Sequence, residues 1–474
     1  MTEMLAIILA AGEGKRMKSA QPKVLHKVGG LPIVGHVVRA ARDAGATALA
    51  VVTGPGHESV REAIRPLAPE AVFFEQIERR GTAHAAGMAR PVFETATGHV
   101  LVVYGDHPLL RAENFALVTE RLDAGLDGAV LGFEPKDPTG YGRLLTEGER
   151  LVAIREHKDA NALERAIGLC NACILGFRAE LFRTLIDRVG SDNAQNEFYL
   201  TDLVELANKA GAKVGYAVAP EADVMGVNDR SQLAKAEAVF QELRREDMME
   251  GGVTLHDPAS VYFSYDTEIA PDVVIEPHVV FGPGVTVESG AVIHAFSHIE
   301  GAHVGPNVSV GPFARLRPGA ELEAGSRAGN FVEIKQAVIG EGAKVNHLTY
   351  IGDADIGART NVGAGTVTCN YDGHNKARTI VGANAFIGSN SALVAPVTIG
   401  DGAYVGSGSV ITRDVPPGAL ALGRGRQVVK EDGVRRLREL QALAKADTKT
   451  GAKGESKGKT KTTPSKKPPQ KPSR

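Results

Sequence analysis

Residues 381–411 read VGANAFIGSNSALVAPVTIGDGAYVGSGSVI, with an aliphatic side chain at every sixth position. The aliphatic positions of this run are Val381, Ile387, Leu393, Ile399, Val405 and Ile411. The same spacing extends upstream over residues 263–322, with one slip of phase. A period of six fits neither an amphipathic helix nor one long strand, but short strands joined by tight corners in a parallel β-helix have this period. Irregular glycine-rich loops, the alternative, have no reason to keep it for so long.

The residue two places before each aliphatic position is small, as at Val285, Ala291 and Ala403. Residues two apart on a strand face the same side, so each strand would place one large and one small side chain inside a narrow prism. Three hexapeptides would complete one coil. The period is broken at residues 329–335 and 368–379. Because interruptions of a solenoid typically form protruding loops, we expect loops at both places.

The length of 474 residues and the hydrophobic content of 43% predict two or three domains with substantial cores. No apolar run is long enough to span a bilayer, and Glu3 is followed at once by a short apolar strand instead of a signal peptide. We therefore expect a cytoplasmic protein without membrane insertion.

The three cysteines are too few for a disulfide framework. Cys170 and Cys173 have a CxxC spacing, but no second pair of cysteines or histidines lies nearby. Residues three apart on a regular strand also face opposite sides. The sequence therefore favours two buried thiols over a metal or redox site.

The end of the chain is basic, because residues 447–474 contain eight lysines and one arginine against Asp447 and Glu455, a net charge of +7. No apolar residue follows Ala452, which predicts a disordered tail. Attraction to nucleic acid is one alternative. The expectation is a solubilising tail without a nucleic-acid partner.

The first half of the chain alternates short apolar runs with helical stretches, which predicts an α/β domain with a mainly parallel sheet. The apolar runs are 5–9, 48–53, 100–103, 129–133, 174–177 and 214–217. Ligands of such domains bind at the carboxyl ends of the strands. Apolar residues at helical spacing then predict a helix over residues 229–250, which would link this domain to the β-helix.

The first of these strands continues into Leu9-Ala10-Ala11-Gly12-Glu13-Gly14-Lys15-Arg16-Met17, and Pro22-Lys23 follows closely. Small residues allow backbone N–H groups to surround an anion, and the basic residues add positive charge. The segment is not a Walker loop, and it lacks the third glycine of a dinucleotide fingerprint. Judged by spacing alone, an ordinary glycine-rich turn explains it equally well.

This segment nevertheless resembles the signature of sugar-phosphate nucleotidyltransferases, and the six-residue repeats resemble the left-handed hexapeptide β-helix of acyltransferases. Over roughly residues 4–430 the chain is similar to the bacterial bifunctional N-acetylglucosamine-1-phosphate uridylyltransferase/glucosamine-1-phosphate N-acetyltransferase family. The resemblance implies an α/β, Rossmann-like uridylyltransferase domain over 1–228 and a linker helix over 229–250. A left-handed parallel β-helix acetyltransferase domain with a C-terminal segment would cover 251–446, and the basic disordered tail 447–474.

What the resemblance implies about function is a two-step synthesis. Acetyl-CoA would acetylate glucosamine-1-phosphate, and UMP would then pass from UTP to N-acetylglucosamine-1-phosphate. The products would be UDP-N-acetylglucosamine, a precursor of cell wall and lipopolysaccharide, and pyrophosphate. Uridylyl transfer brings two polyanions together, so the family's Mg²⁺ and a lysine would neutralise their charge. The family also implies a homotrimer that binds acyl-CoA between neighbouring subunits.

The uridylyltransferase residues of the family match positions throughout the first half of this chain. Asp106, which follows an apolar strand, and Asn228 would hold Mg²⁺, and Lys23 would bind phosphate. Gln76, Gly81 and Thr82 match the segment that recognises uracil. The family commonly has Gln-Leu-Gly-Thr where this chain has Arg79-Arg80-Gly81-Thr82, and Asn-Thr-Gly or Asn-Ser-Gly where it has Asn171-Ala172-Cys173. The whole set for UTP and the nucleotide sugar is Leu9, Ala10, Ala11, Gly12, Lys23, Gln76, Gly81, Thr82, Tyr104, Gly105, Asp106, Gly142, Glu156, Asn171, Thr201 and Asn228.

By the same resemblance His347 is the acetyltransferase base, and Glu333 would orient its ring. Arg317, Lys335, Tyr350 and Asn361 match contacts of the sugar phosphate. Ala364, Asn370, Tyr371, Ser389, Ser407 and Arg424 match contacts of acetyl-CoA, and some relatives have alanine in place of Ser407.

Two rival functions were weighed against this interpretation. Histidines in the repeats, such as His294 and His298, raise the alternative of a zinc carbonic anhydrase, but Arg317 and Lys335 suit a phosphosugar better. The same two-domain arrangement occurs in regulatory subunits of translation-initiation exchange factors, which are not enzymes. The retained set of Lys23, Asp106, Asn228 and His347 favours an enzyme.

Overall fold

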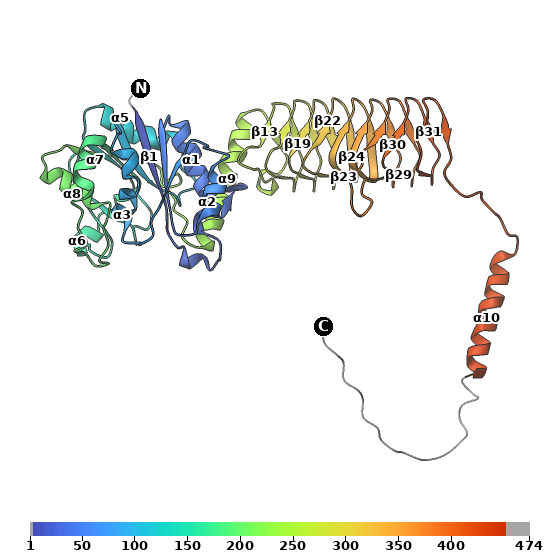
Figure 1. Ribbon diagram of the computed structural model, residues 1–474, viewed down its shortest axis with the longest axis horizontal. Helices are drawn as coiled ribbons and strands as arrows, with labels where there is room; N and C mark the ends of the chain where they lie inside the picture. Colours follow the sequence, from blue (N-terminus) through green and yellow to red (C-terminus); the bar gives the residue numbers. More distant parts are fainter. Residues whose placement is uncertain (1–2, 452–474) are drawn as a thin grey trace, which may run out of the picture. The chain divides into compact units, whose positions relative to one another are not determined.

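The computed structural model describes residues 3–451 of the chain. The chain separates into two compact units, one that ends at Gly423 and one that begins at Arg424. Within the first unit, an α/β domain precedes a long stack of short strands (Figure 1). None of the helices between residues 3 and 451 combines the length and apolar character that a bilayer span requires.

The α/β domain contains a nine-stranded sheet in the order β5-β4-β1-β6-β10-β7-β11-β9-β8. The neighbours from β5 to β6 are parallel, as are β7 and β11, whereas β10 is antiparallel to both of its neighbours. Since β9 is also antiparallel to β11 and β8, the sheet is mixed, whereas a mainly parallel sheet was predicted; all six predicted strands are present. The strands are β1 Met4–Ala10, β4 Ala48–Thr53, β5 Val72–Glu75, β6 His99–Tyr104, β7 Gly128–Phe133, β8 Arg143–Glu147, β9 Arg150–Arg155, β10 Cys170–Arg178 and β11 Val214–Val218.

Helices cover both faces of this sheet, because alternate strand residues are apolar in both directions. Ile8 and Val103 pack on the same side as α1, α2 and α5, whereas Ile7 and Val102 pack on the side of α3, α4, α7 and α8. The helices are α1 Ile33–Asp43, α2 Glu58–Ile64, α3 Thr82–Gly87, α4 Arg90–Phe93, α5 Ala112–Asp123, α6 Ala162–Arg165, α7 Ala179–Ile186 and α8 Asp202–Lys209.

Cys170 and Cys173 are free buried thiols, as predicted. They nevertheless belong to the same core cluster instead of facing opposite sides, because the register of β10 shifts between Asn171 and Leu175. Burial raises the pKa of the Cys173 thiol, which keeps it protonated and unreactive.

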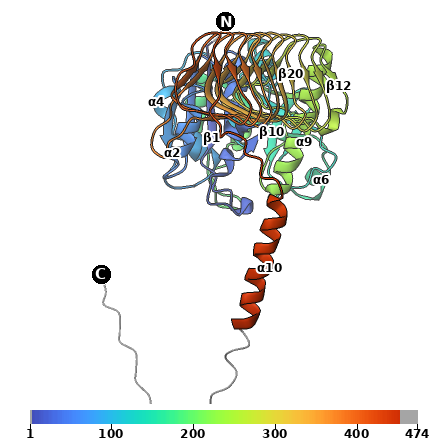
Figure 2. The ribbon, with the colours of Figure 1, turned by 90° about the vertical axis from the view of Figure 1, so that its right-hand side faces the viewer.

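The six-residue repeats form the predicted parallel β-helix. Most of the short strands pair in parallel with the third strand after them, so Glu268 lies beside Thr286 one coil later. The coils lie behind one another when viewed along the stack (Figure 2). The periodic residues, such as Ile293 and Ile387, form one continuous core together with the small residues two places earlier, such as Ala291 and Ala385.

Most strands of this stack are only two or three residues long. They are β12 Thr254–Leu255, β13 Glu268–Ile269, β14 Val274–Ile275, β15 Val280–Phe281, β16 Thr286–Val287, β17 Val292–Ile293, β18 His298–Ile299, β19 Ala302–Val304, β20 Ser309–Val310, β21 Arg315–Leu316, β22 Ala320–Leu322, β23 Arg327–Ile339, β24 Lys344–Ile356, β25 Asn361–Val362, β26 Val367–Cys369, β27 Thr379–Val381, β28 Phe386–Ile387, β29 Ala392–Val394, β30 Val397–Ile399, β31 Tyr404–Val405, β32 Val410–Ile411 and β33 Leu420–Ala421.

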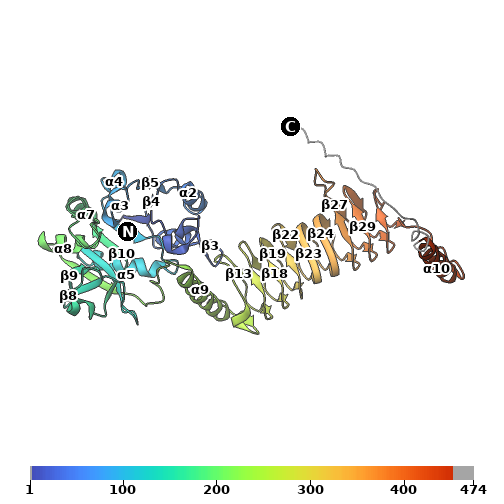
Figure 3. The ribbon, with the colours of Figure 1, turned by 90° about the horizontal axis from the view of Figure 1, so that it is seen from below.

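One of the two expected loops is absent. Residues 329–335 lie within β23, which turns corners at Phe331 and Gln336 and pairs with β24 over ten positions. The chain therefore stays in the coil here, and the prediction of a loop was wrong. The other prediction is confirmed, because the chain leaves the stack between β26 and β27 and protrudes there (Figures 1 and 3). Arg378 anchors the end of this insertion by donating from Nε to Asp355 Oδ2 at 2.6 Å.

The expected helix between the two halves is α9, Arg230–Glu250. Gln241 of this helix is buried against the first coil, where it donates to Phe263 O at 2.7 Å and accepts from Phe263 N at 2.8 Å. The turn between β2 (Lys27–Val28) and β3 (Leu31–Pro32) contacts both elements. Gly29 N donates to Glu237 Oε2 at 2.8 Å, and Gly29 O accepts from Tyr265 N at 2.8 Å.

The second unit contains helix α10, Gly433–Gly451. This helix crosses the boundary at residue 447 where the disordered tail was expected to begin. The remainder of the predicted tail, residues 452–474, lies outside the described residues. The second domain was expected to cover residues 251–446. The boundary between the two compact units, after Gly423, lies within this range.

Candidate functional site

The loop after β1 leaves three consecutive backbone donors unpaired. Within residues 3–451, the N–H groups of Ala11, Gly12 and Glu13 donate to no protein acceptor. The loop packs closely on Lys23, because a Cβ at Gly14 would lie 2.6 Å from Lys23 Cβ, and Gly14 has a φ of +63°. Glycine is required here, and the close approach places the Lys23 side chain beside the unpaired donors.

Lys23 joins two loops that follow different strands. Its Nζ lies 2.5 Å from Asp106 Oδ2 and 3.1 Å from Asn228 Oδ1. Asp106 follows the carboxyl end of β6, and Val227 N donates to Asp106 O at 2.9 Å, which fixes the loop that carries Asn228. The three predicted residues therefore meet at the carboxyl edge of the parallel strands, where ligands of such sheets bind.

Burial alone would favour the neutral carboxyl of Asp106. The positive charge of Lys23 and, next, the contact with His107 outweigh burial and hold the pKa of Asp106 well below its usual range. Asp106 Oδ1 is buried without a hydrogen bond, since His107 Nδ1 lies 2.8 Å away but outside hydrogen-bonding geometry. Oδ1 is thus the oxygen of this carboxylate that accepts no hydrogen bond from the protein.

A cavity of about 270 Å³ opens between this loop and α3. It brings together most of the residues predicted to bind the nucleotide, which lie far apart in the sequence. Its lining comprises Leu9, Ala11, Gly12, Lys23, Val24, Gln76, Arg79, Gly81, Thr82, Ala85, Tyr104, Asp106 and Glu197.

Arg79, one of the two arginines that depart from the family pattern, lines this cavity. Its Nε donates to Ala11 O at 2.8 Å and its Nη1 to Glu13 Oε1 at 2.6 Å. The side chain therefore ties the segment that carries Gln76 to the loop after β1, and together with Lys15 it neutralises the Glu13 carboxylate on that loop.

Four predicted sugar residues meet near Tyr104. Thr201 Oγ1 donates to Glu156 Oε1 at 3.1 Å, and Asn171 N donates to Gly142 O at 2.8 Å. A Cβ at Gly142 would lie 3.4 Å from both carboxylate oxygens of Glu156. Asn171 Oδ1 is buried without a hydrogen bond, which leaves an acceptor for a hydroxyl group. Burial raises the pKa of Glu156 and of Tyr104.

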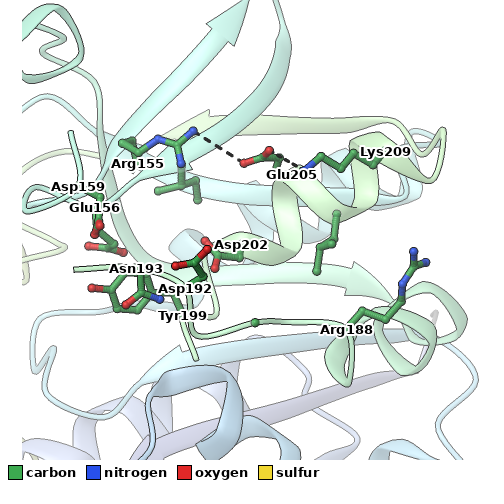
Figure 4. A pocket seen from close by; sticks show the side chains of 13 residues that line it. Arg155, Glu156, Asp159, Arg188, Asp192, Asn193, Tyr199, Asp202, Glu205 and Lys209 are labelled. Carbon is green, nitrogen blue, oxygen red and sulfur yellow. Dashed lines mark ion pairs between the residues drawn. The ribbon is translucent and has the colours of Figure 1, made fainter. Parts of the chain in front are cut away.

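Glu156 also lines a second cavity, of about 240 Å³, shown in Figure 4. Its other carboxylates include Asp159, Asp192 and Asp202. Burial raises the pKa of Asp202, and Glu205, also in the lining, forms ion pairs with Arg155 and Lys209. An acidic lining repels phosphate, so the cavity beside Lys23 suits a nucleotide better.

In the β-helix, His347 is exposed on β24 and pairs with Asn330 on the neighbouring coil. Asn330 Oδ1 accepts from His347 Nδ1 at 2.6 Å. The expectation that Glu333 orients this ring was wrong, because Glu333 pairs in register with Tyr350 and accepts from Arg317 Nη1 at 2.8 Å. With the proton on Nδ1, neutral His347 keeps a lone pair on Nε2.

Successive coils stack other predicted residues along the same corner. Gly365 N donates to His347 O, Asn390 N to Ala364 O, and Gly408 N to Ser389 O. His347, Ala364, Ser389 and Ser407 thus form one column, since Ser407 immediately precedes Gly408. Asn361 lies outside this column on the preceding strand, β25.

A group of cations lies at the other end of the strand that carries Tyr350. Lys335 pairs in register with Gly352, and Lys376 of the inserted loop lowers the pKa of Lys335 by proximity. Two neighbouring ammonium groups favour an anion between them. Asn370 Nδ2 donates to Asp353 Oδ2, and Tyr371 Oη donates to Gly373 O at 2.6 Å within the same loop.

Comparison with known proteins covers nearly the whole chain. The family model of the MobA-like NTP transferase domain matches residues 6–168, and that of the bacterial transferase hexapeptide, with six repeats, matches residues 378–413. Bifunctional protein GlmU of Azorhizobium caulinodans is 55% identical over 445 residues, 93% of this chain and 99% of the relative. The chain belongs to the GlmU family. Two further relatives support this assignment. Bifunctional protein GlmU of Bartonella quintana is 50% identical and covers 92% of this chain and 98% of the relative, and that of Agrobacterium fabrum is 52% identical and covers 94% and 98%.

As a GlmU-family member the chain is a bifunctional transferase, with uridylyltransferase and acetyltransferase activities that use UTP and acetyl-CoA. The nucleotide-binding half of the predicted set forms one site in the first unit. The acetyltransferase set divides between the His347 column and the cations near Lys335, and Arg424 begins the second compact unit.

Sequence reasoning missed three residues of this GlmU-family chain that contact predicted ones. Asn330 lies 17 residues before His347, so the coil length of the repeats would have placed them side by side. Lys376 lies in the insertion that was recognised as polar. Arg79 was noticed only as a departure from the family pattern, and nothing in the sequence indicates its contact with Glu13.

Proposed function

We propose that residues 1–228 carry the uridylyltransferase site and residues 251–446 the acetyltransferase site, joined by the helix over 229–250. The observation that carries the first assignment is the Lys23 ammonium group between Asp106 and Asn228, beside the unpaired N–H groups of the loop after β1. Positive charge and free donors in one place suit a triphosphate.

Asp106 and Asn228 would hold the Mg²⁺ of this site. The donor set fits, because Mg²⁺ is commonly bound by one or two protein oxygens together with substrate phosphates. Asp106 Oδ1 is buried and accepts no hydrogen bond, and Asp106 stays ionised at neutral pH. Bound there, Mg²⁺ would supply charge neutralisation for the phosphates.

In uridylyl transfer the phosphate of N-acetylglucosamine-1-phosphate attacks the α-phosphorus of UTP, and pyrophosphate leaves. No side chain needs to act as a nucleophile. Lys23 and the N–H groups of residues 11–13 hold the triphosphate, while Gln76 and Gly81 meet the base. Glu156, Asn171 and Thr201, with Gly142, bind the sugar hydroxyl groups.

In acetyl transfer the amine of glucosamine-1-phosphate attacks the thioester of acetyl-CoA. The amine must first lose a proton, and His347 Nε2 has the lone pair to accept it. Lys335, with Arg317 and Lys376, binds the sugar phosphate. Acetyl-CoA follows the column of Ala364, Ser389 and Ser407, with Asn370 and Tyr371 of the inserted loop as further contacts.

We further propose that the protein is a homotrimer. Phe296, Phe313 and Phe331 stack on successive coils with ring centroids 4.9 and 5.1 Å apart, although each side chain is about half exposed. Leu348, which is 64% exposed, continues this row beside His347. Exposed apolar rows of this length typically mark interfaces, and a second copy would cover this one. The substrates are intracellular metabolites, which supports a cytoplasmic location.

One assay tests both assignments. Purified protein is incubated with glucosamine-1-phosphate, acetyl-CoA, UTP and Mg²⁺, and each component is omitted in turn while free CoA thiol and pyrophosphate are measured. Acetyl transfer should precede uridylyl transfer, so omission of acetyl-CoA should stop both signals, and omission of UTP only pyrophosphate. Pyrophosphate release from glucosamine-1-phosphate without acetyl-CoA would contradict the proposed order. Sedimentation equilibrium should give three times the chain mass.

A further inference from the structure

The amide of Gln76 has one defined orientation in the nucleotide cavity. Its Nε2 donates to Gly81 O at 3.1 Å and lies 3.0 Å from Nδ1 of His84. A backbone carbonyl oxygen can only accept a hydrogen bond. The end of the amide that faces Gly81 O must therefore be the NH₂ group. The other end must then be the oxygen, Oε1, and this assignment does not depend on His84.

This orientation also fixes the proton position on His84. The NH₂ group of Gln76 can only donate, so His84 Nδ1 must be an unprotonated acceptor and the ring proton lies on Nε2. Both N–H bonds of the amide are then used. Within the described residues no hydrogen bond ends on Gln76 Oε1, although Gln76 is buried and lines the cavity.

We propose that His84 is a positioning residue that selects the base. By holding the NH₂ group of Gln76, it leaves the amide oxygen as the acceptor that meets the base. Uracil has an N–H donor at its N3 position, whereas cytosine has a lone pair there. The fixed oxygen therefore attracts uracil and repels cytosine. This inference rests on the proposed function, in which UTP occupies this cavity.

His84 is itself held firmly enough to act in this way. It lies on α3, whose first turn is fixed by the segment that follows residue 197. Ala83 N donates to Phe198 O at 2.9 Å, and Leu200 N donates to Thr82 Oγ1 at 2.9 Å. The His84 ring also packs near the Phe198 ring, with centroids 6.5 Å apart. Without His84, one N–H of the amide would lose its acceptor, and only the bond to Gly81 O would still favour the orientation that turns Oε1 away from Gly81.

Two substitutions separate this role from simple packing. His84→Phe keeps a ring against Phe198 but removes the acceptor, whereas His84→Asn keeps a carbonyl oxygen near the position of Nδ1. Initial rates of pyrophosphate release with N-acetylglucosamine-1-phosphate give kcat/KM for UTP and for CTP. One neutral hydrogen bond is worth about 0.5–1.5 kcal/mol, or about 2- to 13-fold. We expect His84→Phe to lower the UTP/CTP ratio about 3- to 10-fold, chiefly through KM for UTP.

His84→Asn should keep the ratio within about twofold of the unchanged protein, and acetyl transfer should be equal in all three proteins. An unchanged ratio in His84→Phe would overturn the proposal. Equal losses with both nucleotides in both variants would also overturn it, since they would show a structural role. If the unchanged protein released no pyrophosphate from UTP, the proposed function itself would fail, which is a different result from a lost preference.

Discussion

Replacement of Asn330 by alanine tests how the acetyltransferase base is held. Asn330 Oδ1 is 2.6 Å from His347 Nδ1, and this contact keeps the ring proton on Nδ1. Without it, both neutral tautomers of the imidazole become accessible, and only one of them has its lone pair on Nε2. The substitution also removes a restraint on the rotation of an exposed ring.

The size of the effect follows from the single bond that is lost. A neutral hydrogen bond contributes about 0.5–1.5 kcal/mol, which corresponds to a decrease in kcat of about 2- to 13-fold. Removal of the base itself by His347→Ala should cost at least about 100-fold, the lower end of general-base assistance. Asn330→Ala should therefore lie clearly between His347→Ala and the unchanged protein.

The assay is release of free CoA thiol at saturating acetyl-CoA, with pyrophosphate release as a check on the first domain. Thr286→Val is a matched control, because Thr286 Oγ1 makes a similar contact with His303 Nδ1 at 2.8 Å, also across 17 residues. This control should retain full acetyl transfer. A loss of 100-fold or more in Asn330→Ala would refute an orienting role, and so would no loss at all.

Three further predictions concern the first domain and its junction with the β-helix. Asp106→Ala should abolish Mg²⁺-dependent pyrophosphate release, as should EDTA, while CoA release persists; equal loss of both would disprove separate sites. Arg79→Gln should raise KM for UTP about fivefold with little change in kcat, because the Glu13 carboxylate loses a cation beside the phosphates. Adding Glu13→Gln should recover most of that loss, and failure to do so would exclude a charge effect. Burial lowers the pKa of His36 to about 4, so the unfolded chain takes up this proton at about pH 6.5 and the folded chain does not. The free energy of unfolding should therefore fall by at most about 3 kcal/mol as the pH is lowered from 6.5 to 4. If the histidine is responsible, His36→Gln should make the free energy from urea unfolding nearly independent of pH over this range.

The β-helix could be predicted in detail because its period is a direct consequence of packing. Ile387 and Leu393 must point inward at every turn, so a regular spacing in the sequence becomes a regular core. The break at residues 329–335 misled the prediction, because a long strand can lose the period without leaving the stack. Whether it does so depends on its pairing with β24, which no local pattern records.

For the site in the α/β domain, the sequence indicated which residues take part but not the distances between them. Lys23, Asp106 and Asn228 follow elements far apart in the sequence, and resemblance to a family indicated that they belong together. Their distances depend on how three loops meet at one sheet edge. Arg79 was missed for the same reason, since a hydrogen bond between distant segments leaves no trace in the local sequence. Asn330 differs, because its separation of one coil from His347 could have been read from the repeats.

The coil length of the β-helix limits which insertions and deletions the chain can tolerate between the proposed uridylyltransferase and acetyltransferase sites. From β13 to β24, positions paired between coils lie 17 or 18 residues apart, as in Glu268 with Thr286 and Asn330 with His347. Coils of 17 and 18 residues share one core, so a corner accommodates one residue more or less, but an insertion within a strand would turn inward-facing side chains outward. Addition or removal of a whole coil would preserve every inward position and shift the acetyltransferase site by about 4.8 Å, the spacing of adjacent strands. The distance between the two sites can therefore change only in steps of one coil.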